Sequence, residues 1–87
     1  MPRSASAEEI TAWCRDHVAR TMERPLEKID PDVKLARLGF DSASSVHLMI
    51  ALEEWLEIEL EPELAFEHAT LRQLAIHIAG LLPRAAA

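Results

Sequence analysis

Apolar side chains recur at helical spacing in three segments of this sequence, and that periodicity limits the chain to a helical fold. Residues that favour helices, such as Ala, Leu and Glu, are abundant, whereas tyrosine is absent and there are only two glycines. With 87 residues the chain can bury one small core. We predict an all-α four-helix bundle, made of three main helices and one short helix, as a single domain over residues 1–87 with an ordered core from about 6 to 83.

Capping signals and a proline define the first helix and the loop that follows it. Ser6 and Glu9 form an S-x-x-E capping box, and the residue before Pro25 disfavours the helical conformation, so the first helix should run from about 7 to 23. Residues 25–40 then form a long loop, which is uncommon in a compact domain and often functional. Five apolar residues should anchor this loop: Ile29, Val33, Leu35, Leu38 and Phe40.

The second helix should begin at Asp41-Ser42 and end near Leu56, with the Asp41 carboxylate accepting hydrogen bonds from free amide groups. Helical spacing places five residues on its inward side: Ser45, Leu48, Met49, Leu52 and Leu56. A second set lies opposite, is bordered by Ser42 and is called the partner face from here on: Ala43, Val46, His47, Ile50, Glu53, Glu54 and Glu57.

Beyond the second helix, the segment "LEIEL" alternates with period two, but a lone strand is unstable, so we predict a connection there. Pro62 suits the first position of a short helix over "PELAFEH", residues 62–68. Thr70 and Gln73 form another capping box ahead of the last helix, which Pro83 should stop.

The net charge of −6 argues against nucleic acid, which proteins bind mainly through Lys and Arg. No apolar run approaches the roughly 20 residues of a membrane span, and the N-terminal segment lacks the apolar core of a secretory signal. The lone cysteine, Cys14, excludes an intrachain disulfide. We expect a cytoplasmic monomer that does not bind membranes.

No Lys or Arg occurs between Arg37 and Arg72. That interval contains eight acidic residues: Asp41, Glu53, Glu54, Glu57, Glu59, Glu61, Glu63 and Glu67. They form either a solvated acidic surface or a docking face for basic partners, and composition alone does not separate the two.

No metal site is expected, because Cys14 and His17 share a helical face but two possible ligands do not make a zinc site. Core packing is the better account of both residues. Trp13 should also anchor the core, and Trp55 should be partly buried at the edge of the inward side of the second helix.

Three chemical interpretations of Ser42 compete. A catalytic serine needs a base within reach, yet His47 lies about 140° around the helix from Ser42. A purely structural role at a helix start explains Asp41-Ser42, but not the anchored loop or the face beside it. The third interpretation is a covalent attachment point, because free amides and the helix dipole stabilise a phosphate ester at a helix N-terminus. With the partner face alongside, this suits a carrier that passes between enzymes.

The stretch "LGFDSASSVHLMIALEEWL" resembles the carrier-protein pattern L-G-x-D-S-Φ-x-x-V-E-L followed by an L-E-E run. The stretch "FEHATLRQLAIHI" is similar to the F-x-H-P-T-x-x-x-L-A-x-H-I ending of polyketide synthase carriers, and "IDPDVKLARLGFDS" matches the loop before the serine. Together these motifs cover the chain and resemble the acyl carrier protein family.

The resemblance implies a four-helix bundle whose Ser42, preceded by Asp41, receives 4′-phosphopantetheine from coenzyme A through a phosphopantetheinyl transferase. The thiol of that arm would hold acyl or polyketide intermediates as thioesters for polyketide synthase or other acyl-transfer enzymes. A carrier of this kind is not an enzyme. The acidic partner face would then bind the transferase and the synthase enzymes.

Three residues depart from the family pattern. Ala43 stands where a larger apolar residue is usual, His47 replaces the usual glutamate, and Ala69 replaces a proline. The first two leave attachment at Ser42 intact but affect the choice of partner. Two alternatives stay open, namely a peptidyl carrier domain of nonribosomal peptide synthesis and an unmodified helical interaction module.

Overall fold

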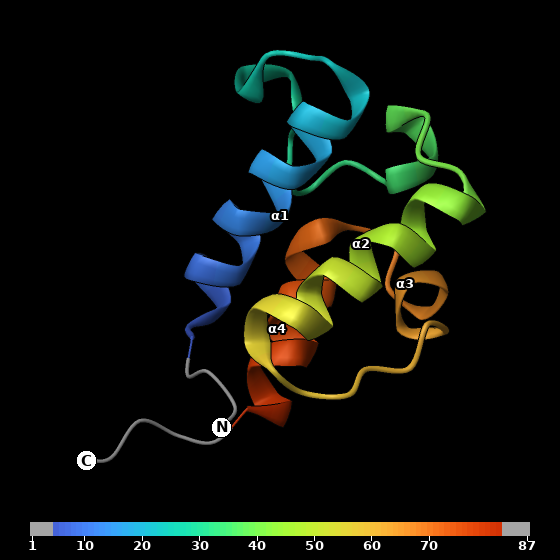
Figure 1. Ribbon diagram of the computed structural model, residues 1–87. Coiled ribbons are helices and arrows are strands. Elements are labelled where there is room, and N and C mark those ends of the chain that lie inside the picture. Colours follow the sequence, from blue (N-terminus) through green and yellow to red (C-terminus); the bar gives the residue numbers. More distant parts are fainter. Residues whose placement is uncertain (1–4, 83–87) are drawn as a thin grey trace.

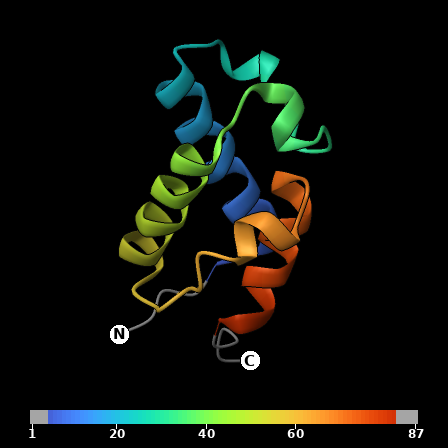
Figure 2. The ribbon, with the colours of Figure 1, turned by 90° about the vertical axis from the view of Figure 1, so that its right-hand side faces the viewer.

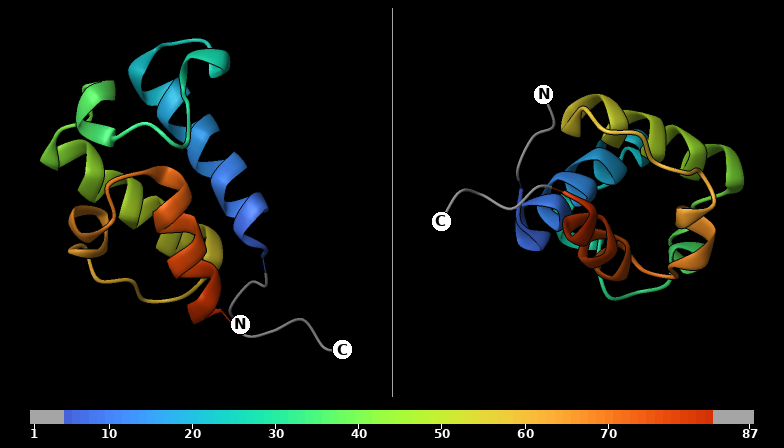
Figure 3. Two further views of the ribbon diagram at one scale, coloured as in Figure 1. Left: turned by 180° about the vertical axis from the view of Figure 1, so that it is seen from behind. Right: turned by 90° about the horizontal axis from the view of Figure 1, so that it is seen from below.

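The computed structural model describes residues 5–82, which contain helices and no strand. The four α-helices are α1 (Ala7–Met22), α2 (Ser42–Leu56), α3 (Leu64–Glu67) and α4 (Leu71–Leu81). α1 runs in the opposite direction to α2 and α4, and α4 lies between α1 and α3 when the molecule is seen from behind (Figures 1 and 3). The predicted all-α four-helix fold is confirmed. No helix among residues 5–82 is long and apolar enough to span a membrane.

The predicted capping residues define where α1 and α4 begin. The Ser6 hydroxyl accepts the N–H of Glu9, and the Glu9 carboxylate accepts the N–H of Ser6, each at 3.1 Å. At α4 the Thr70 hydroxyl accepts the N–H of Gln73 at 3.1 Å. The Gln73 side chain, however, accepts the N–H of Ala69 in place of that of Thr70, so only half of the second capping box forms. Pro83, predicted to stop this helix, lies outside the described residues.

The short helix α3 is confirmed but is smaller than predicted. Pro62 and Glu63 form a turn before it, so Pro62 is not its first helical residue. The N–H of Ala65 donates to the carbonyl of Pro62 at 3.2 Å, an i→i−3 bond, and the N–H of Glu67 donates to Glu63 at 3.0 Å, an i→i−4 bond. The chain therefore enters α3 through a tight turn, which delays the α-helical geometry.

The core forms where α1, α2 and α4 face one another. All five residues predicted on the inward side of α2 are buried: Ser45, Leu48, Met49, Leu52 and Leu56. Cys14 of α1 is also buried, as predicted. Trp13 and Trp55 are half-buried, and their rings stack across α1 and α2 with centroids 4.8 Å apart and planes within 2°. This stack joins the two helices at the edge of the core.

The connection between α1 and α2 is long, as predicted, and contains 3-10 helices at Leu26–Lys28 and Leu35–Leu38. Four of its five predicted anchors are buried, namely Ile29, Leu35, Leu38 and Phe40. The fifth, Val33, is half-buried. This connection and the one over residues 57–63 lie at opposite ends of the bundle (Figures 1 and 2).

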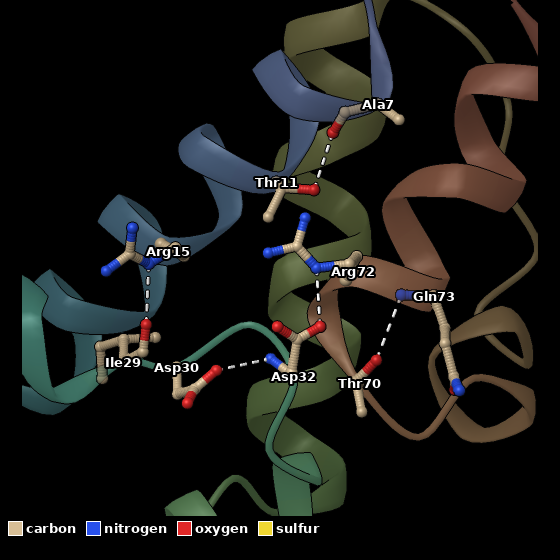
Figure 4. A network of polar contacts seen from close by, with 9 residues as sticks. All are labelled: Ala7, Thr11, Arg15, Ile29, Asp30, Asp32, Thr70, Arg72 and Gln73. Atoms are coloured by element: carbon tan, nitrogen blue, oxygen red, sulfur yellow. Dashed lines mark hydrogen bonds and ion pairs between the residues drawn. The ribbon is translucent and has the colours of Figure 1, made fainter.

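Polar contacts also hold this loop in place (Figure 4). The Arg15 guanidinium on α1 donates to the carbonyl of Ile29 at 2.7 Å. The Arg72 guanidinium at the start of α4 forms an ion pair with Asp32 at 2.6 Å. The loop is thus attached to both α1 and α4, and this sets the point from which the chain enters α2.

Candidate functional site

A glycine turn brings the chain to the start of α2. Leu38 and Phe40 are buried on either side of Gly39, whose φ of 85° lies in the left-handed region. A Cβ at this position would be strained and would lie 3.4 Å from the terminal methyl carbon of Met22. The "LGF" segment therefore anchors the chain on both sides of a turn that needs glycine, and the next residues emerge at the surface.

Asp41 caps α2 as predicted. Its Oδ1 accepts the N–H of Ser44 at 2.8 Å, and its backbone is extended, as an N-cap requires. The hydrogen bond from the Ser44 N–H, helped by one from the Ser44 side chain and by the nearby charge of His47, lowers the pKa of Asp41 below its ordinary value of 3.8. The carboxylate stays charged beside Ser42 at neutral pH.

Ser42 is the first residue of α2 and is exposed. A hollow of about 390 Å³ opens beside it, between the long loop, α2 and α3. Four apolar residues and the buried Ser45 form much of its wall; the apolar ones are Leu35, Phe40, Ala65 and Phe66. Lys34 and His68 also line it. The site therefore combines an exposed hydroxyl, free helix N–H groups and an adjacent hollow of mixed character.

The surroundings of Ser42 and Cys14 bear on the catalytic interpretation of these residues. Within residues 5–82 no hydrogen bond joins Ser42 to a histidine. Burial raises the pKa of the Cys14 thiol to about 12, so that thiol stays protonated and unreactive. The same part of the chain has no group of three or more His, Cys, Asp and Glu residues that could hold a metal ion.

The structure places the partner-face residues on the outside of α2, with two exceptions. Five of them are exposed: Ala43, His47, Ile50, Glu54 and Glu57. Val46 is half-buried. Glu53 is also half-buried, and its carboxylate accepts the backbone N–H of Leu60 at 3.0 Å. Glu53 thus serves the fold directly, which its place in the sequence does not reveal.

His47 lies toward α1. Its charge affects the pKa values of both Asp41 and His17, so it is within electrostatic reach of the cap and of the α1 surface. His17 stacks on Trp13 with ring centroids 5.5 Å apart. Burial, followed by the charge of Arg20, lowers the pKa of His17 below its ordinary 6.5.

Sequence reasoning did not assign three residues that line the hollow beside Ser42, namely Lys34, Phe66 and His68. Lys34 and His68 lie outside α-helices, where spacing gives no orientation, and α3 is too short for periodicity to place Phe66. His68 contacts His77 of α4 with ring centroids 4.7 Å apart. The exposure of Phe66, at 57%, sets it apart from the core residues beside it.

Comparison with known proteins identifies the family. The family model described as "Phosphopantetheine attachment site" matches residues 12–78, which is most of the chain and includes Ser42. An acyl carrier protein of Streptomyces coelicolor is 37% identical over 81 residues, covering 91% of this chain and 88% of that protein. The chain belongs to the acyl carrier protein family. The predicted family, fold and phosphopantetheine cofactor are thereby confirmed.

Two further matches compare this acyl carrier chain with a polyketide synthase and with a solved peptidyl carrier protein. It is 32% identical over 77 residues to an erythronolide synthase of Saccharopolyspora erythraea, covering 87% of this chain but 2% of that synthase. A crystal structure of a free-standing peptidyl carrier protein from Acinetobacter baumannii superposes with a TM-score of 0.82 at 32% identity, covering 87% of this chain and 95% of the other. The chain is a carrier of the type found in polyketide synthases, with peptidyl carriers as structural neighbours.

Proposed function

We propose that Ser42 is the residue that receives 4′-phosphopantetheine from coenzyme A. The observation that carries this proposal is the position of Ser42, exposed at the first residue of α2 and next to a hollow of about 390 Å³. A phosphodiester at this position would lie by the free N–H groups of the helix N-terminus, which favour negative charge. Neither neighbouring serine combines these features. Ser45 is buried, and Ser44 is half-buried and lies two residues further into the helix.

The residues around Ser42 fit such an arm. When attached, phosphopantetheine supplies a terminal thiol that carries acyl groups as thioesters. The apolar walls given by Leu35, Phe40 and Phe66 suit the uncharged part of the arm, and Lys34 suits the phosphate or a polar group of the cargo. Asp41 holds the first turn of α2 in place, so the Ser42 hydroxyl is presented from a fixed backbone.

The partners would be a phosphopantetheinyl transferase and the synthase enzymes that load and unload the arm. The partner face offers exposed Ile50, with half-buried Val46 beside it, as apolar contacts. Glu54 and Glu57 add exposed negative charge, and no Lys or Arg occurs in the segment between Arg37 and Arg72 to which they belong. In this proposal the protein is a cytoplasmic monomer that catalyses nothing itself.

Incubation with coenzyme A and a phosphopantetheinyl transferase, followed by intact-mass spectrometry, tests the proposal. The wild type should gain the mass of one phosphopantetheine arm, and Ser42→Ala should gain nothing. Ser44→Ala is the matched control and should be modified as the wild type is. An unmodified wild type would instead favour the helical interaction module.

A peptidyl carrier is the second candidate, because one of the solved structures that match this fold is a peptidyl carrier protein. The two candidates differ in their loading enzymes. An acyl carrier should be loaded by an acyltransferase that uses acyl-coenzyme A, whereas a peptidyl carrier should be loaded by an enzyme that adenylates amino acids. Loading assays with the modified protein and each enzyme separate the two.

A further inference from the structure

A second hollow borders α3 and shares no lining residue with the hollow beside Ser42, although its His77 contacts His68 of that first hollow. It has a volume of about 270 Å³ and is bounded by the connection after α2, by α3 and by the C-terminal half of α4. Six residues line it, and the name distal hollow refers to them: Glu59, Leu60, Glu61, Leu64, His77 and Leu81. Three of these residues belong to the connection that follows the C-terminal end of α2, whereas Ser42 is the first residue of that helix.

The path of the chain after α2 separates acidic from apolar side chains. Residues 57–61 alternate, so that Leu60 points into the core while Glu59 and Glu61 are exposed. The hydrogen bond from the Leu60 N–H to the Glu53 carboxylate fixes this register. The connection therefore presents two carboxylates along the rim of the distal hollow.

The interior of the distal hollow is apolar. Leu60 and Leu64 are 5% and 8% exposed and form its base, whereas Leu81 is 53% exposed and forms an uncovered wall on α4. The Leu81 side chain leaves apolar surface in water next to this apolar base, and removing apolar surface from water is favourable. Burial of the Leu81 side chain by a partner would remove this apolar surface from water.

The charges at the rim indicate the chemistry of that partner. No Lys or Arg lines the distal hollow, and within residues 5–82 neither Glu59 nor Glu61 forms an ion pair. These carboxylates do not combine with His77 into a group that could hold a metal ion. The surface thus offers an apolar base with two uncompensated negative charges above it.

We propose that the distal hollow binds a segment of a partner protein that carries Leu-type side chains flanked by Lys or Arg. The apolar side chains would cover Leu81 and enter above Leu60 and Leu64, and the cations would pair with Glu59 and Glu61. No residue that lines the distal hollow also lines the hollow beside Ser42, so such a partner would use a different surface from an enzyme that acts at the serine. The proposal goes beyond attachment and does not depend on it.

Titration with a short amphipathic peptide of lysine and leucine, followed by amide shifts in two-dimensional NMR, tests this proposal. The protein used is the Ser42→Ala variant, so the result is independent of the arm. The backbone amides of Leu60, Leu64, His77 and Leu81 should shift. The same peptide with glutamate in place of lysine should produce no shift there.

Charge variants then separate specific docking from general attraction to an acidic protein. Glu59→Gln with Glu61→Gln should weaken the binding measured at the distal hollow by at least about fivefold. Glu63→Gln with Glu67→Gln removes the same amount of charge from nearby residues that do not line the hollow. This control should weaken peptide binding less than about twofold. The proposal is overturned if the hollow amides do not shift, or if the two double variants weaken binding equally.

Discussion

The carboxylate of Glu53 accepts a hydrogen bond from the backbone N–H of Leu60, with 3.0 Å between Oε2 and the nitrogen. This bond joins the last turns of α2 to the connection that follows and leaves Glu53 half-buried. Its neighbour Glu54 is exposed and takes no part in it. Two adjacent glutamates with the same chemistry thus have different roles, one in the fold and one on the surface.

The Glu53 bond should be visible in stability. Glu53→Ala leaves the Leu60 N–H without its acceptor and should lower the free energy of unfolding by about 1 kcal/mol or more. Glu53→Gln keeps an acceptor oxygen and should cost less. Glu54→Ala is the control and should change stability by no more than about 0.5 kcal/mol. Urea denaturation of the three variants measures these differences, and equal effects at positions 53 and 54 would contradict the assigned role.

The orientation of α2 makes a second prediction. Leu52 is fully buried, so Leu52→Ala should lower the free energy of unfolding by roughly 2–4 kcal/mol through the cavity it opens. Ile50 is 46% exposed, so Ile50→Ala should cost under about 1 kcal/mol. The reverse order in denaturant melts would mean that the inward side of α2 has been misassigned.

Docking at the partner face should depend on Glu54 and Glu57 and on salt. Changing both to lysine should slow phosphopantetheinylation by about tenfold, chiefly through the association rate, because the charges that attract a basic enzyme surface are reversed. The wild-type rate should also fall as ionic strength rises past about 0.15 M.

A matched control for this experiment exists at and just after the C-terminal end of α1. Glu23 and Glu57 both occupy left-handed positions at helix C-caps, with φ of 54° and 56°. Glu23→Lys with Glu27→Lys therefore makes the same charge change, at an equivalent cap, off the partner face. This control should react at nearly the wild-type rate. If both double variants slow the reaction equally, only the net charge matters and the partner face has no specific role.

The cap at Asp41 predicts a dependence of stability on pH. Hydrogen bonds from Ser44 lower the pKa of Asp41 in the folded state, so the charged form stabilises the fold above the unfolded value of 3.8. That contribution should be lost as the pH falls from 3.8 through the lowered folded value. Asp41→Asn keeps a capping oxygen without a titrating group, so its stability should fall less steeply with acid. Urea melts between about pH 5 and pH 2.5 test this, with Glu54→Gln as the control.

Local signals in the sequence predict most of this fold. The Ser6–Glu9 box, the Asp41 cap and the Thr70 cap fix where helices begin, because capping involves residues only two or three positions apart. Helical spacing likewise identifies the buried side of α2 from Ser45 to Leu56. These features depend on residues close together in the chain, so the sequence alone shows them.

Contacts between distant segments are what the sequence does not predict. The bond from Glu53 to Leu60 depends on the path of a connection without periodicity. The Arg72–Asp32 ion pair joins residues 40 positions apart, and the hollow beside Ser42 needs Lys34 and His68 to arrive from separate segments. The late start of α3 has a different, local origin: the turn at Pro62 and Glu63 sets where this four-residue helix begins, and α3 is too short for periodicity to show it.

The central claim is that Ser42 carries the phosphopantetheine arm, and the most direct test is to locate that arm on the protein purified from its native host. Proteolysis followed by tandem mass spectrometry should find one phosphopantetheine on the peptide that contains residues 38–52, and fragment ions should assign it to Ser42. An arm on Ser44, Ser45 or a residue outside this peptide would contradict the claim. So would a native protein that carries no arm and stays unmodified with coenzyme A and a transferase.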